Sequence, residues 1–205
     1  MNFTQWTGIA RKAQRGLAGA LLVGALAGGA WAAAPAVPAP EGALPIRMIA
    51  AGRDDAALRR IEFTRGKLPG KFSRRKNFAW AVAKIDGLDK VEYFAHSGVD
   101  RRGELSSAAA ATIEDISIRP KKRGQFEVLC VNHNDEVEGA DCFPRYSDTE
   151  YKIMEDLAAH LPDPAARGRV RIYTDLYPCA SCRHVMHQFL GVYTNVRIQV
   201  LYRER

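Results

Sequence analysis

The clearest hydrophobic pattern along the chain is an alternation that begins at residue 77. Residues 77–85 carry Phe78, Trp80 and Val82 at every second position, which is the period of a β-strand with one face against a core. Residues 90–96 form a second run after a short glycine-containing turn, so the two runs predict a β-hairpin. Further strands are predicted over residues 126–131, 169–174 and 195–203.

Two longer segments show the helical period instead. In residues 151–161, Ile153, Leu157 and Leu161 fall one turn apart along a single face, and residues 180–190 have a similar spacing that stops before a glycine. Strands that are connected through helices in this order predict a sheet covered by helices. A shorter helix is predicted over residues 54–62, whereas residues 67–76 and 98–146 are predicted to be mainly turns and irregular structure.

The first part of the chain differs from this globular pattern. Basic residues precede an apolar run over residues 16–30. Ala30-Trp31-Ala32 then matches the small-x-small pattern of a signal-peptide cleavage site. A membrane anchor would need about 20 apolar residues, so a cleavable signal peptide is the prediction. The mature protein is then expected to be periplasmic or secreted and not held in a membrane. The predicted division is residues 1–32 as signal peptide, 33–67 as an Ala/Pro-rich tether with a short helix, and 68–205 as the folded domain.

Composition narrows the class of protein. A chain of 205 residues with 47% hydrophobic and 26% charged residues has ordinary globular composition, with room for one domain and a leader. Cleavage of the signal peptide would remove three basic residues and no acidic ones and lower the net charge from +7 to +4, a mild excess that suits an anionic ligand without requiring one. Two basic runs, Arg74-Arg75-Lys76 and Lys121-Lys122-Arg123, are candidates for contacts to a phosphate backbone or are simply solvated turns.

Export changes how the cysteines are interpreted. Cys130 and Cys142 lie outside the predicted core elements and are expected to form a disulfide in an oxidising compartment. Cys179 and Cys182 have the spacing of a redox dithiol or of two metal ligands. A structural zinc site built from all four cysteines is a further alternative.

Two motifs stand at the predicted helix starts. Ser147-Asp148-Thr149-Glu150 has the Ser-x-x-Glu pattern of a capping box, with Tyr146 and Tyr151 as a possible hydrophobic staple. Pro178-Cys179-Ala180-Ser181-Cys182 lies where a strand gives way to a helix. Each motif alone has an ordinary structural explanation.

Together the motifs indicate zinc-dependent nucleobase deaminase chemistry. Such enzymes take one ligand and a nearby Glu from one helix start, and two thiolates from Pro-Cys-x-x-Cys at another. The positive end of a helix favours thiolate over thiol and therefore favours metal binding. Zinc acidifies a bound water, and a neighbouring Glu transfers the proton to the leaving ammonia.

At these residues the chain resembles the bacterial polymorphic-toxin deaminase family, a branch of the cytidine deaminase-like superfamily. The matching stretches are residues 77–81 and 95–97 of the hairpin, Pro144 to Glu150, and Pro178 to Cys182. The resemblance implies an α/β fold, a three-layer α/β/α sandwich with a mixed sheet. It also implies a secreted toxin domain that acts on nucleic acid or nucleotide. Glu150 would be the proton shuttle, and Cys179 and Cys182 would be thiolate ligands of Zn²⁺.

The third ligand is open to two assignments. The superfamily has His or Cys at the position that Asp148 occupies here, and a carboxylate can also bind zinc. The alternative ligand is His96, at the far end of the hairpin and therefore next to Asn77. Asn77 and His96 are otherwise expected to contact the substrate at the rim of the pocket.

Three classes of function follow from these patterns. The first is deamination of cytosine, favoured over adenine, in nucleic acid or nucleotide, with an immunity protein as a possible partner. The second is a catalytically silent secreted binding module that zinc or a disulfide stabilises. The third, a thiol oxidoreductase, leaves the Asp-x-Glu motif unexplained.

Overall fold

The computed structural model describes residues 44–203, and its centre is a five-stranded mixed sheet. The strand order is β1-β7-β6-β2-β3, in which β1, β7 and β6 run parallel while β2 is antiparallel to both β6 and β3. The strands are β1 (Ile46–Met48), β2 (Phe78–Ile85), β3 (Glu92–His96), β6 (Gly168–Thr174) and β7 (Val196–Tyr202).

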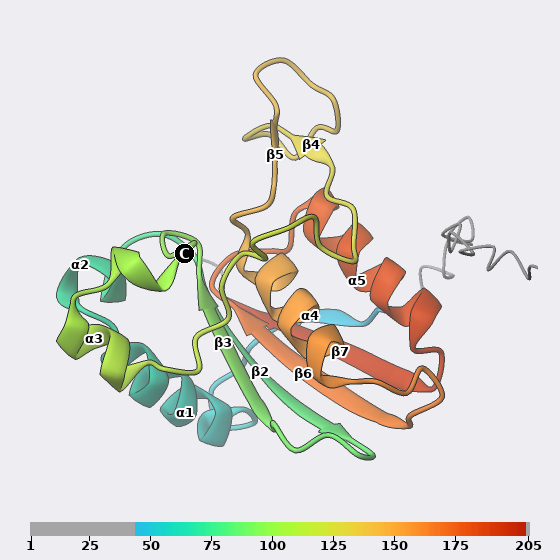
Figure 1. Cartoon of the computed structure of the whole chain (residues 1–205), viewed down its shortest axis with the longest axis horizontal. Coiled ribbons are helices and arrows are strands. Elements are labelled where there is room, and N and C mark those ends of the chain that lie inside the picture. Colours follow the sequence, from blue (N-terminus) through green and yellow to red (C-terminus); the bar gives the residue numbers. More distant parts are fainter. Residues whose placement is uncertain (1–43, 204–205) are drawn as a thin grey trace, which may run out of the picture. The chain divides into compact units, whose positions relative to one another are not determined.

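Helices α4 (Thr149–His160) and α5 (Ala180–Val192) cover one face of the sheet (Figure 1). The alanines of β2 turn towards this face, where their small side chains allow the two helices to pack closely. The periodic residues Ile153 and Leu157 of α4 are fully buried there, as is Phe189 of α5. Burial of each such side chain stabilises the fold by about 1.5–3 kcal/mol.

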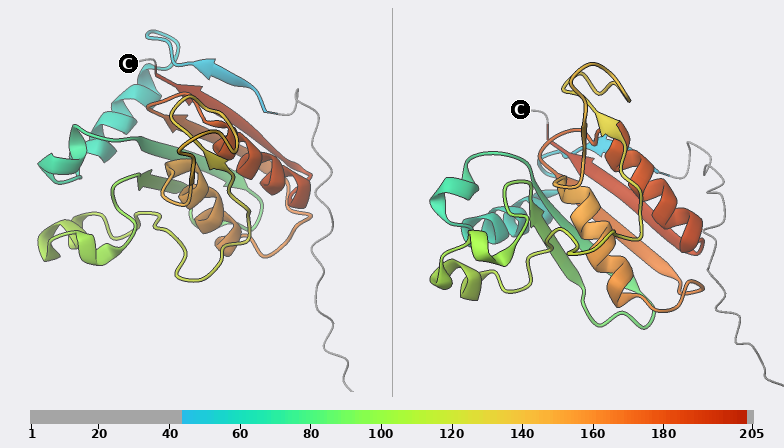
Figure 2. Two further views of the ribbon diagram at one scale, coloured as in Figure 1. Left: turned by 90° about the horizontal axis from the view of Figure 1, so that it is seen from above. Right: turned by 45° about the horizontal axis from the view of Figure 1, so that its top comes forward.

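The opposite face receives the alternate residues of the same strands. Phe78 and Trp80 of β2 pack there with Ile61 of α1 (Asp55–Gly66) and with Ile113, which ends α3 (Ser107–Thr112). A short helix, α2 (Gly70–Ser73), connects α1 to β2. Figure 2 shows these helices and the α4–α5 pair on either side of the sheet. The predicted three-layer α/β/α sandwich with a mixed sheet is therefore confirmed.

The long strands and helices agree with the hydrophobic pattern to within a few residues, and the differences lie in the short elements. Residues 126–131 were predicted to be a strand, whereas only Cys130–Val131 form one, β4, which pairs with β5 (Phe143–Pro144) in a separate ribbon. Residues 106–112 were placed in irregular structure, and they form α3 with Ser106 as its N-cap. Residues 46–48, assigned to the tether, pair with β7 as an edge strand of the sheet.

The β4–β5 ribbon projects from the end of the sheet where α4 and α5 begin (Figure 1). A disulfide joins Cys130 and Cys142 at its base, as the sequence predicted, so these cysteines are not available to a four-cysteine zinc site. Cys179 and Cys182 are free thiols.

The predicted signal peptide and most of the tether lie outside the described residues. Within residues 44–203, no helix has both the length and the apolar character that crossing a bilayer requires.

Candidate active site

At one end of the sheet, the starts of α4 and α5 meet the segments that carry the other predicted site residues. Asn77 immediately precedes β2, and its amide nitrogen donates to the hydroxyl oxygens of Thr149 at 2.9 Å and Thr174 at 3.0 Å. Thr149 is the first residue of α4 and Thr174 is the last residue of β6. These side-chain bonds fix the start of α4 against the ends of two strands.

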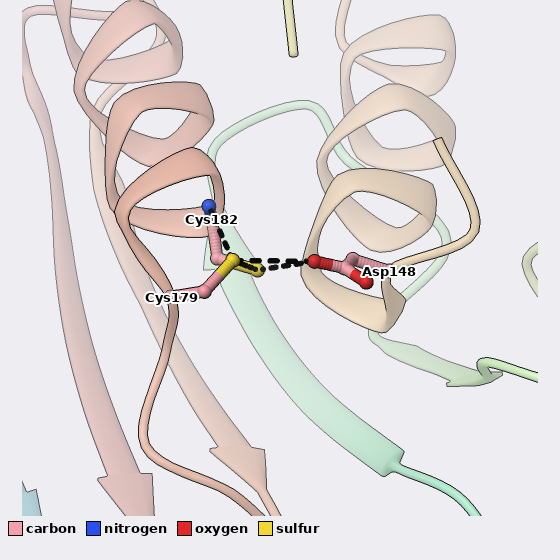
Figure 3. A group of neighbouring side chains, drawn as sticks. All are labelled: Asp148, Cys179 and Cys182. Carbon is pink, nitrogen blue, oxygen red and sulfur yellow. Dashed lines mark hydrogen bonds between the residues drawn. The ribbon is translucent and has the colours of Figure 1, made fainter. Parts of the chain in front are cut away.

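Asp148, Cys179 and Cys182 form a compact group between the two helix starts (Figure 3). Their potential ligand atoms all lie within 4.8 Å of one another. The Cys179 and Cys182 sulfur atoms are 3.2 Å apart, and each lies 3.2–3.3 Å from Asp148 Oδ2. The sequence predicted these three residues as metal ligands, and the fold brings their potential ligand atoms together.

Glu150 lies next to this group without being part of it. Its carboxylate is almost fully buried, with 1% of the residue exposed, and its Oε2 lies 3.5 Å from the Cys182 sulfur. The Thr149 hydroxyl donates to the same Oε2 at 2.7 Å, so Asn77, Thr149 and Glu150 form one hydrogen-bonded chain. The sequence assigned no role to Thr149, which lies inside the first motif, or to Thr174, which ends β6 four residues before the second motif.

The electrostatics of the group favour a cation. Burial, and after it the Asp148 carboxylate, raises the pKa of Glu150. The hydrogen bond with Cys179, burial and the carboxylates of Glu150 and Asp148 together raise the pKa of the Cys182 thiol well above its usual value. A divalent cation would offset the negative charge of these carboxylates, and a thiol that coordinates such a cation is deprotonated. Two sulfurs and one carboxylate oxygen form a donor set that suits zinc and leaves a fourth position for water.

Comparison with known proteins decides the family. Residues 62–204 match the model of a toxin-deaminase family, described as the BURPS668_1122 family of deaminases. The chain belongs to this family of toxin deaminases. Neither the curated proteins nor the solved structures contain a match to the chain. Membership confirms the resemblance to bacterial toxin deaminases and supports a deaminase activity in general.

The start of α4 in this toxin deaminase differs from the predicted capping box. Asp148, not Ser147, is the N-cap, and no side-chain cap bond forms. The Ser147 hydroxyl instead donates to Asp100 Oδ2 at 2.7 Å, because the loop after β3 lies beside it. The rings of Tyr146 and Tyr151 do meet, edge to face, with centroids 5.8 Å apart.

At the start of α5 in the deaminase, the cysteine motif forms its own cap. Cys179 is the N-cap, and its sulfur accepts from the Cys182 amide at 3.4 Å. Asp135, from the β4–β5 ribbon, accepts from the Ala180 amide at 2.6 Å and pairs with Arg183 at 3.2 Å. The ribbon thus places a carboxylate at the positive end of the helix that carries both thiols.

His96 lies near Asn77 in the deaminase, as predicted, but not with the three clustered residues. Only 1% of the residue is exposed, and both ring nitrogens face the backbone: Nδ1 accepts from the Gly98 amide at 3.0 Å, and Nε2 lies 2.8 Å from the Arg75 carbonyl oxygen. Burial lowers the pKa of His96, which favours the neutral ring. His96 therefore joins the segment before β2 to the loop after β3.

Proposed function

We propose that this toxin deaminase is a zinc-dependent hydrolase that deaminates a nucleobase in nucleic acid or nucleotide, with cytosine ahead of adenine, and that it acts after export. The observation that carries the proposal is the position of Glu150, buried beside the group of Asp148, Cys179 and Cys182. A carboxylate next to a three-donor set, but outside it, is the arrangement that hydrolytic deamination needs.

Asp148, Cys179 and Cys182 are the residues that would hold the zinc ion. When bound, zinc supplies the acidification of a water molecule near neutral pH. The start of α5 favours thiolate forms of the two cysteines, since its unpaired amides carry partial positive charge. The N-cap position of Asp148 directs its carboxylate from the start of α4 towards the same point (Figure 3).

Glu150 would move the proton. In the net reaction water adds to the amidine carbon of the base, and ammonia leaves as a carbonyl forms. The Glu150 carboxylate would take a proton from the water and return it to the departing amine. The Thr149 hydroxyl bond to Oε2, the oxygen that lies 3.5 Å from the Cys182 sulfur, fixes the orientation of the carboxyl group beside the three donors.

The remaining parts of the proposal have separate support. The toxin-deaminase family supports a nucleic acid or nucleotide substrate and a toxic role. Export rests on the basic and apolar pattern before Ala32. The preference for cytosine rests on the family resemblance.

The test uses protein purified from a bacterium that expresses the full chain. The intact mass of the exported form should be that of a chain that begins directly after Ala32. Purified wild-type protein should bind one zinc ion and convert C to U in single-stranded DNA, RNA or nucleosides. Glu150→Gln should keep the zinc and lose activity by at least about a hundredfold, the lower bound for general acid–base catalysis.

Two double-cysteine variants provide the matched control. Cys179→Ser with Cys182→Ser should lose the zinc, whereas Cys130→Ser with Cys142→Ser should retain it. Zinc in neither the wild type nor the second variant would remove the proposed cofactor. Full zinc content with no conversion of any base would favour a silent binding module.

A further inference from the structure

A groove lies beside the start of α4, where Tyr146 and Tyr151 line it. It has a volume of about 1090 Å³ and lies between the loop after β3 and the segment that leads from α3 to β4. Small-molecule sites usually occupy about 300–1,000 Å³, so this groove suits an extended ligand. Its basic lining residues are Arg101, Arg102, Arg119, Lys121, Lys122 and Arg123.

The charges in the groove are poorly balanced by the protein itself. Its one acidic lining residue, Asp100, already contacts Lys152 and Ser147. Within residues 44–203, no carboxylate lies within ion-pair distance of Lys121 or Lys122. Arg101 and Arg123 do pair with glutamates, but these pairs are largely exposed, with 85% and 80% of the two arginine side chains accessible, and so contribute little.

An aromatic ring accompanies the charges. Tyr146 lines the groove with its ring partly exposed, next to the buried Tyr151, and the Arg119 guanidinium carbon lies 4.6 Å from the centroid of the Tyr146 ring. Basic side chains interleaved with aromatic rings are the usual surface for single-stranded nucleic acid, where phosphates meet the charges and bases stack on rings or on arginine. A free nucleoside would use none of the phosphate contacts.

The groove adjoins the candidate active site. Tyr146 lines the groove, and Asp148 two residues later belongs to the group of potential metal ligands. Their Cα atoms can be at most about 7.6 Å apart, since consecutive Cα atoms are about 3.8 Å apart. Figure 1 shows the segment that leads from α3 to β4 passing over α4.

Buried side chains of α4 hold both walls of the groove in place. Lys152, with no exposed side-chain surface, binds Asp100 and the carbonyl oxygen of Val99 in one wall. Glu155 accepts from the Gln125 and Phe126 amides beside the other wall, at 2.9 and 2.8 Å. Charged side chains are rarely buried unless they are paired, and here their partners hold the two walls in place.

We propose that this groove binds the sugar–phosphate backbone of a single-stranded polynucleotide and guides one base into the active site. The proposal rests on the proposed function for its substrate class. It adds a binding track and makes a polynucleotide, not a free nucleoside, the substrate.

The experiment measures binding of labelled single-stranded DNA and RNA oligonucleotides to the Glu150→Gln protein by fluorescence anisotropy. Adding Lys121→Glu and Lys122→Glu should weaken binding at least tenfold. The log–log salt slope should fall by about 1.4, because two phosphate contacts each contribute about 0.7 on single strands. The DNA and RNA arms show which polynucleotide binds more tightly.

The matched control reverses two exposed arginines on the far face of the sheet, Arg169→Glu and Arg197→Glu, with the same change in net charge. This pair should change the dissociation constant by less than twofold. Equal weakening by both pairs, or by neither pair, would overturn the groove assignment.

Base conversion by the wild-type protein is measured separately. Groove-dependent binding without conversion would therefore reject the proposed function alone, and conversion without groove dependence would reject the inference alone.

Discussion

The sheet with α4 and α5 and the segment over residues 97–146 are held together in different ways. In the first region the backbone is paired internally, through strand ladders and helical turns. In the second region short elements alternate with extended chain, and much of that chain is anchored by side chains of α4 and α5. The comparison shows that the two helices have a double role: they carry the candidate active site and they fix the loops around it.

Residues 126–129 illustrate the anchoring. The amide of Phe126 donates to Glu155 of α4, and that of Glu127 donates to Gln188 of α5 at 3.0 Å. The amide of Leu129 donates to Ser181 of α5, also at 3.0 Å. Residues 126–129 were predicted to form part of a strand, and these side-chain bonds take the place of strand pairing. They also satisfy the amide of the buried Phe126, which would otherwise be costly to bury.

The largest effect that separates the two regions is expected at Lys152. Lys152→Met removes the ammonium group that pairs with Asp100 and donates to the carbonyl oxygens of His96 and Val99. Breaking a buried pair costs about 3–5 kcal/mol of unfolding free energy, and the lower end applies because the Asp100 side chain is 31% exposed. Denaturant unfolding monitored by circular dichroism measures the change.

Lys90→Met is the control for this prediction, because Lys90 also pairs with an aspartate, Asp156, at 2.8 Å. Both side chains of that pair are about one-fifth exposed, at 21% and 20%. Its loss should cost about 1 kcal/mol or less. Similar costs for the two lysines would show that Lys152 does not anchor the loop.

These anchors mark the limit of what the sequence could predict. The alternation in β2 and the two motifs at the helix starts are local signals, so the central strands, α4, α5 and the group of Asp148, Cys179 and Cys182 could all be located. The burial of Lys152 could not, because its partners are distant in sequence. His96 was open to two assignments for the same reason: only the fold shows that backbone groups of neighbouring loops occupy both ring nitrogens.

A smaller effect is expected from the disulfide between Cys130 and Cys142. The bridge closes a loop with a sequence separation of 12. Replacing both cysteines by serine should lower the unfolding free energy by about 2–3 kcal/mol, since a short loop gains less from closure than a long one. Hydrogen exchange should quicken in the β4–β5 ribbon while the amides of α4 and β6 stay protected. Uniform loss of protection across both regions would contradict the distinction drawn between them.

The smallest effect is expected at Asp135, where the ribbon meets α5. Asp135 has φ +64°, a left-handed conformation that Asn and Gly also adopt readily. Asp135→Asn keeps an oxygen for the Ala180 amide and loses only the charge near the positive helix end and Arg183, which should cost about 0.3–1 kcal/mol. Asp135→Gly keeps the backbone conformation and removes the acceptor as well, so it should cost about 1 kcal/mol more. Thermal unfolding of the two variants beside wild type separates the charge from the hydrogen bond. A glycine variant as stable as the asparagine variant would mean that the ribbon lies against α5 without stabilising its first turn.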